Sequence, residues 1–120
     1  MGYVDGFVAA VPAAHKAQYR EYAEKAAAIF MEHGATRVVE CWGDDVQDGT
    51  VTDFRRSVQA GENEIVVFAW IEYPSREVRD RVQGAMMSDP RMADIGEMPF
   101  DGKRMTWGGF TPILDEHRPA

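Results

Sequence analysis

The segment Glu64–Tyr73 constrains the fold more than any other part of the chain, because both of its alternating residue sets are apolar at the centre. In an extended strand, successive side chains point to opposite faces of the sheet. One set contains Ile65, Val67, Ala69 and Ile71, and the other contains Val66, Phe68 and Trp70. We therefore expect both faces of this strand to be covered.

Three other segments have the composition of strands, rich in Val, Phe, Tyr and Trp: Tyr3–Val11, Arg37–Trp42 and Arg104–Phe110. The long connection Gly43–Asn63 exceeds an ordinary hairpin loop and should fold over the surface, anchored by Phe54 and Val58.

Helical patterns occupy the intervening stretches. Over Ala13–His33 apolar residues recur at steps of three and four, and Gly34 follows where a C-terminal cap is expected. Ser75 is a suitable N-cap for a second helix with an apolar stripe through Val82. A short third helix should begin at Pro90 and end near Ile95.

The predicted order is strand, helix, strand, strand, helix, strand, which is the ferredoxin-like βαββαβ arrangement of the α+β class. Right-handed crossovers then give one antiparallel sheet in the order 4-1-3-2, with both helices on one face. No linker divides residues 1–120, so we expect a single domain. A second copy packed through a two-fold axis would cover the free face of Glu64–Tyr73, which predicts a homodimer.

Charge and composition exclude several classes of function. The net charge is −7 and no basic stripe is present, so we expect no binding to nucleic acid. The longest apolar run, Ile65–Ile71, is far shorter than the roughly 20 residues of a membrane helix. Cys41 has no intramolecular disulfide partner, and Met1–Val11 lacks the pattern of a secretory signal. Both observations favour a cytoplasmic location.

No motif for a cofactor or metal was found. Asp44, Asp45 and Asp48 do not match a calcium loop and are better explained as turn residues. Phosphate-binding and dinucleotide-binding glycine motifs are absent, and Gly108-Gly109 indicates a close approach of backbone. We therefore expect neither a cofactor nor a metal.

Single reactive residues have ordinary explanations. Cys41 is a candidate nucleophile, but on a buried strand a free cysteine behaves as a small hydrophobic residue. His33 lies in the last turn of a predicted helix, where a cation favours the helix dipole. The methionines are interpreted as core or gap-filling residues.

The set of ionisable residues of most interest is Asp5, Glu40 and Arg104, each inside a predicted strand, where an unpaired charge is costly. In one interpretation they are solvated or form structural ion pairs. In the other they line the polar end of a ligand-binding pocket, with Trp107 as an apolar wall and further walls from Phe68 and Trp70.

The chain resembles a known family through Tyr3–Val8, Val39–Cys41, Tyr73–Ser75 with Asp80, and Met98–Met105, in this order over nearly the whole length. These segments are similar to those of the YbaA-like bacterial family of unknown function. That family resembles the dimeric αβ-barrel superfamily, so the resemblance implies this fold and a dimer but no particular chemistry. A protein that binds a small molecule is favoured, and a cofactor-independent monooxygenase- or isomerase-like enzyme acting on a small aromatic substrate is the alternative.

Overall fold

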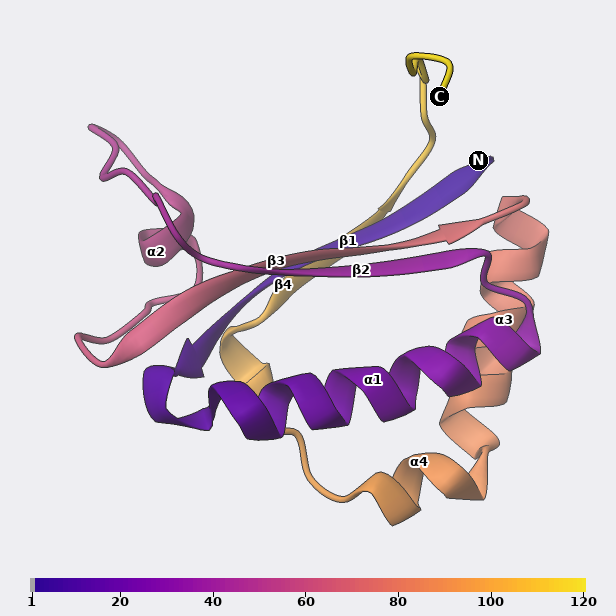
Figure 1. Ribbon diagram of the computed structural model, residues 1–120, viewed down its shortest axis with the longest axis horizontal. Coiled ribbons are helices and arrows are strands. Elements are labelled where there is room, and N and C mark those ends of the chain that lie inside the picture. Colours follow the sequence, from indigo (N-terminus) through magenta and orange to yellow (C-terminus); the bar gives the residue numbers. More distant parts are fainter. Residues whose placement is uncertain (1) are drawn as a thin grey trace.

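The computed structural model describes residues 2–120, and in this part of the chain four strands form one antiparallel sheet (Figure 1). The strands are β1 (Tyr3–Pro12), β2 (Arg37–Trp42), β3 (Glu64–Tyr73) and β4 (Thr106–Phe110). Their spatial order is β2-β3-β1-β4. This confirms the predicted α+β class and the predicted strand order, and it is the arrangement of a ferredoxin-like fold.

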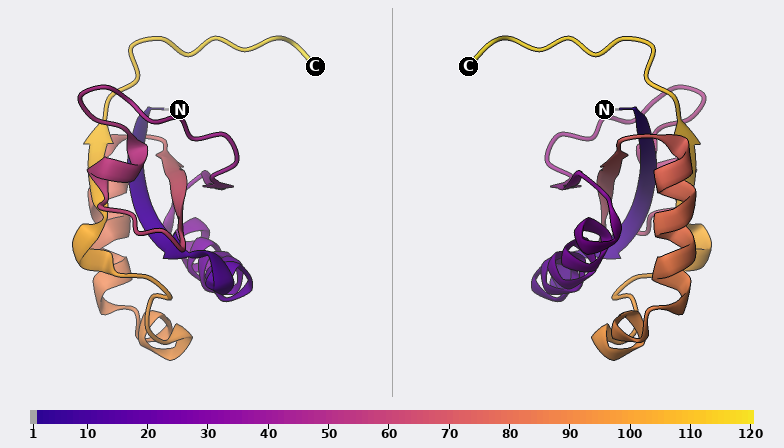
Figure 2. Two further views of the ribbon diagram at one scale, coloured as in Figure 1. Left: turned by 90° about the vertical axis from the view of Figure 1, so that its left-hand side faces the viewer. Right: turned by 90° about the vertical axis from the view of Figure 1, so that its right-hand side faces the viewer.

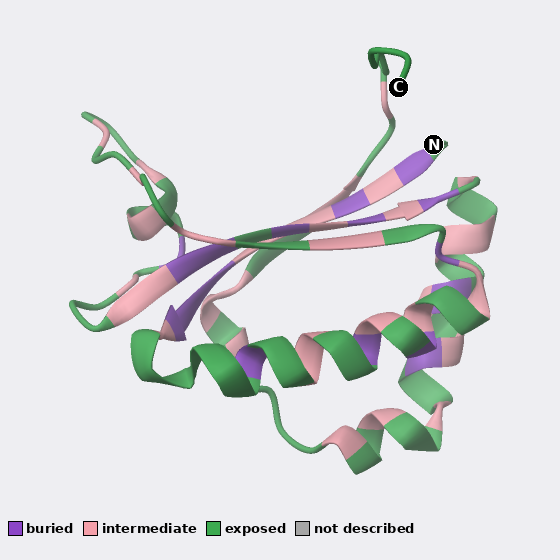
Figure 3. Ribbon diagram, viewed as in Figure 1, coloured by how far each residue is buried: buried purple, intermediate pink, exposed green. Residues whose placement is uncertain are grey.

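Three helices lie on one side of the sheet: α1 (Lys16–His33), α3 (Arg76–Ser88) and α4 (Pro90–Ile95) (Figure 1). The 3₁₀ turn η1 (Ala13–His15) leads into α1, so the predicted first helix begins with a tighter turn. Buried and exposed residues alternate along α1, as expected for an amphipathic helix covering a sheet (Figure 3).

The helix boundaries follow the predicted caps. Gly34 ends α1 with a φ of 135°, a conformation that L side chains rarely adopt. The Ser75 side chain accepts a hydrogen bond of 3.2 Å from the Val78 backbone N–H. At the start of α4, the Asp89 carboxylate accepts a hydrogen bond of 2.9 Å from the Arg91 backbone N–H. Local sequence therefore determines where these helices begin and end.

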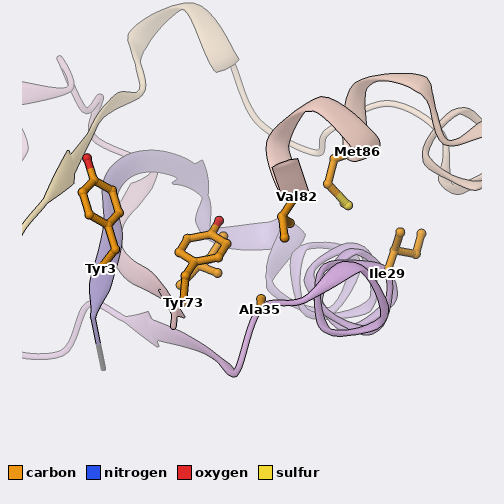
Figure 4. Close-up of a cluster of buried hydrophobic side chains, with 7 residues drawn as sticks. Tyr3, Ile29, Ala35, Tyr73, Val82 and Met86 are labelled. Atoms are coloured by element: carbon orange, nitrogen blue, oxygen red, sulfur yellow. The ribbon is translucent and has the colours of Figure 1, made fainter. Parts of the chain in front are cut away.

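The main core lies between the sheet and the helices. Figure 4 shows its side chains coming from β1, β3, α1, α3 and the turn after α1. Tyr73 and Val82 are completely buried at its centre. Since side chains of one strand alternate between faces, this core takes only one of the two apolar sets of β3.

The opposite side of the sheet, called here the outer face, is covered at one end only. The short helix α2 (Phe54–Ser57) and the turn after it bring Val58 onto Val66, and both are buried. The Phe54 ring meets the Phe68 ring edge-on at 6.0 Å between centroids. Phe68 is nevertheless 46% exposed, so the predicted second cover is only partly supplied by residues 2–120.

Two predictions about local structure were wrong. Arg104 belongs to the 3₁₀ turn η2 (Gly102–Arg104) and not to the last strand, because Asp101 caps this turn and β4 starts only at Thr106. Cys41 is exposed, because β2 is an edge strand and residues 2–120 leave its outer face uncovered.

After β4 the chain extends away from the domain as an irregular segment (Figure 2). Ile113 and Leu114 in this segment are strongly exposed. None of the helices formed by residues 2–120 combines the length and apolar character needed to cross a membrane.

Candidate functional site

A cavity of about 410 Å³ opens between the sheet and the helices. Small and aromatic residues of α1 form one wall, and β1, β2 and β4 form the roof. Five methionines from α3, α4 and the chain that follows complete it: Met86, Met87, Met92, Met98 and Met105. The polar side chains among its lining residues are few, and two of them are the carboxylates of Asp5 and Glu40. An apolar cavity of this size with few polar groups is typical of a small-molecule site.

Strand register brings Asp5 and Glu40 to the same face of the sheet. Asp5 pairs with Ile71 across β1 and β3, and Glu40 pairs with Ala69 across β2 and β3. Because directly paired residues share a face and Ala69 is two residues from Ile71, both carboxylates point toward the helices.

The Asp5 carboxylate is buried, and hydrogen-bond donors surround it. It accepts hydrogen bonds from the Tyr73 hydroxyl at 3.0 Å, from Nε of Arg79 at 3.0 Å and from Nε2 of Gln83 at 3.1 Å. The side chain is 8% exposed and that of Arg79 is 11% exposed. Burial and the neighbouring Asp5 charge raise the pKa of the Tyr73 hydroxyl. This arrangement is a satisfied buried ion pair joining β1 to α3.

Gly109 makes room for this ion pair. A Cβ at this position would lie 2.4 Å from the Tyr3 hydroxyl oxygen and 2.7 Å from Nη2 of Arg79. The guanidinium of Arg79 lies 5.2 Å from the Tyr3 ring centroid and 5.9 Å from that of Trp107. The close approach predicted for Gly108-Gly109 is therefore confirmed at Gly109, where side chains of β1 and α3 pack onto the backbone of β4.

Glu40 has a different environment. The Tyr19 hydroxyl of α1 donates a hydrogen bond of 2.6 Å to Oε1 of Glu40. Within residues 2–120, no Lys, Arg or His nitrogen forms an ion pair with this carboxylate. Desolvation by the surrounding protein raises the pKa of Glu40, and the Tyr19 hydrogen bond partly opposes this. Desolvation and the Glu40 charge in turn raise the pKa of Tyr19.

Solvent reaches Glu40 through a second hollow, a groove between α1 and β2 that is lined in part by Lys16, Arg20 and Trp42. Tyr19 and Glu40 line both the cavity and the groove. Glu40 is therefore exposed although it lies among apolar walls. A carboxylate in such a place is accessible to both a ligand and water.

Arg104 lies apart from the other predicted site residues. It binds both carboxylate oxygens of Glu64, at 2.8 and 2.7 Å, and donates to Asp101 at 3.0 Å and to the Gln59 carbonyl at 2.8 Å. The hydrogen bonds from Arg104, followed by one from the Gly61 backbone N–H, lower the pKa of Glu64 to about 2. Arg104 does not reach Asp5, because the register pairs Asp5 with Gly109 and Arg104 precedes the first residue of β4.

The predicted aromatic walls are divided between the two faces. Trp107 pairs with Phe7 on the helix-facing side, lines the cavity and is 60% exposed at its rim. Phe68 and Trp70 lie on the outer face, where they border a separate apolar hollow. The structure thus brings Asp5, Glu40 and Trp107 around one cavity and places Arg104, Phe68 and Trp70 elsewhere.

Several site residues were not recognised from the sequence. Tyr19 was assigned to the apolar stripe of α1, and its spacing gives no sign that its hydroxyl meets β2. Arg79 and Gln83 of α3 were not singled out in the sequence, and the structure places both against the Asp5 carboxylate. Across residues 2–120, no group of three or more His, Cys, Asp or Glu side chains is arranged to hold a metal ion.

The order of elements and strands places the chain in the class of ferredoxin-like α+β proteins, here with a ligand-sized cavity under the sheet. The chain belongs to the family described as "Protein of unknown function (DUF1428)", which matches residues 2–102. It is 67% identical over 117 residues to the uncharacterized protein YbaA of Escherichia coli strain K12. This alignment covers 97% of the chain and 100% of YbaA, and the same values apply to YbaA of Shigella flexneri. The resemblance seen in the sequence is thereby confirmed.

Proposed function

We propose that the chain binds a small apolar molecule in the cavity between the sheet and the helices. The observation that carries this proposal is an apolar cavity of about 410 Å³ bordered by a carboxylate, Glu40, that is exposed and lacks a basic partner within the described chain. Buried pairs such as Asp5 with Arg79 stabilise a fold, whereas a carboxylate facing an open cavity is available to a ligand.

The walls indicate the chemistry of the ligand. Methionine side chains adapt to the shape of a guest and contact aromatic rings favourably. The acceptors of the cavity are concentrated at Glu40 and the Tyr19 hydroxyl, on the side of α1 and β2. The expected ligand is therefore an uncharged, ring-sized molecule with a polar group that can face Glu40.

Binding of 2-naphthol, followed by calorimetry and ligand-observed NMR, tests the proposal. Ala27 of α1 lines the cavity, whereas Ala28 on the same helix is exposed. Ala27→Leu should fill part of the cavity and weaken binding at least tenfold, and Ala28→Leu, which adds the same atoms, should leave the affinity unchanged. Equal affinity of the two variants, or no binding of 2-naphthol and related fused-ring probes to the wild type, would contradict the proposal.

We further propose that the chain forms a homodimer through its outer face. Phe68 and Phe110 are 46% and 59% exposed there, and Val4, Val8 and Trp70 border the same hollow. A contiguous apolar face of this kind is uncommon on a monomer. A second copy related by a two-fold axis would cover it with an identical sheet, and a stable contact should bury at least about 1,000 Å².

Sedimentation equilibrium at micromolar concentration tests the dimer. Phe68 on the outer face and Met31 on α1 have the same exposed fraction, 46%. Phe68→Lys should convert the dimer to a monomer, and Met31→Lys on the helix side should not. A wild type that sediments as a monomer near 13.5 kDa would exclude the dimer.

A cytoplasmic location is part of the proposal and is supported by the single Cys41, which is exposed and would be kept as a thiol there.

The hydrogen bond between Tyr19 and Glu40 favours a second function, in which the bound molecule is also a substrate. An acid and a base in contact at the edge of an apolar cavity are the parts that proton transfer requires.

A further inference from the structure

Glu40 differs from Asp5 and Glu64 in the type of side chain that binds its carboxylate. The carboxylates of Asp5 and Glu64 are held by Arg79 and Arg104. The Glu40 carboxylate instead accepts a hydrogen bond of 2.6 Å from the neutral hydroxyl of Tyr19. An arginine partner fixes a carboxylate in its charged form, whereas a phenol allows it to exchange protons.

We propose that Glu40 and Tyr19 form a proton-transfer site that interconverts the keto and enol forms of an apolar cyclic carbonyl compound bound in the cavity. This inference rests on the proposed function and names the substrate class of the same site. Both residues line the cavity and the groove, so one side faces the ligand and the other faces water.

The step begins with the Glu40 carboxylate removing a proton from the carbon next to the carbonyl group. The electron pair of the broken C–H bond forms a carbon–carbon double bond, and the carbonyl π pair moves to oxygen and gives an enolate. Once Glu40 is protonated, it accepts the Tyr19 hydrogen bond more weakly. The hydroxyl can then rotate and donate to the enolate oxygen, which stabilises its charge.

The reaction closes when Glu40 returns a proton to the oxygen or to a conjugated carbon. No electron is gained or lost overall, so no oxidant or reductant is required. Because Glu40 borders the groove between α1 and β2, its proton can also exchange with water before it is returned. In D₂O, the substrate should therefore acquire deuterium at the carbon next to the carbonyl group.

The surroundings of Glu40 favour this chemistry at neutral pH. Desolvation raises the pKa of the carboxyl group, which makes it a stronger base once ionised. The titratable and charged groups that line the cavity and the groove around it come from α1 and β1: Lys16, Tyr19, Arg20, Tyr22, Glu24 and Asp5. Cys41 also borders the groove, but it lies on the outer face of β2. Of these, Tyr19 makes the hydrogen bond that opposes the rise.

Hydrogen–deuterium exchange of 2-tetralone in D₂O, followed by ¹H NMR, tests the inference. The wild type should accelerate loss of the signal of the protons next to the carbonyl group, and Glu40→Gln should reduce this acceleration on the order of 100-fold. Glu21→Gln, which changes a solvent-exposed carboxylate of α1 that pairs with Lys25 and lines neither the cavity nor the groove, should keep the full rate. Circular dichroism of each variant shows whether it is folded.

A pH profile distinguishes Tyr19 as a participant from Tyr19 as a packing residue. The wild-type rate should rise with pH and level off above the pKa of Glu40. Tyr19→Phe should lower the plateau and move the profile to higher pH, because the hydrogen bond that favours ionised Glu40 is lost. An unshifted profile with an unchanged plateau would exclude Tyr19 from the step.

Calorimetry with 2-tetralone separates this inference from the proposed function. If 2-tetralone binds but its exchange is no faster than in buffer, or if Glu40→Gln exchanges it at the wild-type rate, proton transfer at Glu40 is wrong and binding stands. If the wild type neither binds 2-tetralone nor exchanges it, while 2-naphthol binds, the substrate class is wrong. If neither compound binds, both proposals fail.

Discussion

Replacing Asp5 by Asn should destabilise the protein strongly, although the two side chains have nearly the same shape. The change removes the charge that faces the Arg79 guanidinium at 3.0 Å, in a place where the two side chains are 8% and 11% exposed. Removing one partner of a buried ion pair costs about 3–5 kcal/mol, because the other charge stays desolvated. Arg79 keeps a contact of 2.9 Å with Asp80, so we expect the lower end, about 3 kcal/mol.

Urea denaturation at pH 7 measures this cost, and thermal melting should show a fall of roughly 10 °C for a domain of this size. Asp80→Asn is a matched control, because it removes the other carboxylate of the same arginine. Asp80 is 55% exposed, so its contact with Arg79 should contribute less than about 1 kcal/mol.

A double-mutant cycle with Arg79→Met isolates the contribution of the pair. If the two residues stabilise each other, Asp5→Asn should cost much less in the Arg79→Met background than in the wild type. A free energy of unfolding for Asp5→Asn within about 0.5 kcal/mol of the wild type would refute the argument that this pair is buried and coupled.

Four further predictions concern Glu40, Glu64, Ser75 and the cofactor content of the purified protein. Because the pKa of Glu40 is raised in the folded protein, its ionisation lowers the free energy of unfolding as the pH rises above the ordinary value of 4.5. Gln at this position does not ionise, so the stability of Glu40→Gln relative to the wild type should increase from pH 4 to pH 8 in urea melts. Glu64, whose pKa is lowered to about 2, stabilises the fold above pH 4.5 and loses this contribution as the pH falls toward 2; Glu64→Gln should therefore be less stable than the wild type at pH 7 and equal to it near pH 2. Ser75→Ala should cost about 1 kcal/mol through loss of the cap of α3, and an unchanged urea midpoint would contradict the cap. The purified protein should carry no haem, flavin or metal, and a Soret band or a stoichiometric metal in elemental analysis would contradict this prediction.

The fold was predictable because its determinants are local. Each signal acts within a few residues of the element that it specifies. The signals are the two-sided apolar alternation in Glu64–Tyr73, the three-to-four periodicity before Gly34, and the caps at Ser75 and Asp89. Once six elements are fixed in order, the handedness of crossovers leaves few arrangements, and the observed sheet order β2-β3-β1-β4 is among them.

The candidate site was predictable only in part. Strand position showed that Asp5 and Glu40 carry charges where charge is costly, and both border the cavity. Their partners could not be deduced, because Arg79 and Tyr19 come from helices that meet the sheet at an angle set by packing. Arg104 was misplaced since the start of β4 depends on a turn capped by Asp101.

The sequence by itself determined the order of the main strands and helices and the strand positions of Asp5 and Glu40, since each of these depends on neighbours along the chain. Tertiary structure alone decided the partners of these charges. Asp5 forms an ion pair with Arg79, and Glu64 forms one with Arg104. Within the described chain, the Glu40 carboxylate accepts a hydrogen bond from the Tyr19 hydroxyl and has no basic partner. These contacts join residues 21 to 74 positions apart. Whether a carboxylate is structural or chemically available depends on such distant partners, because the free energy of a charge is set by the groups that surround it in space.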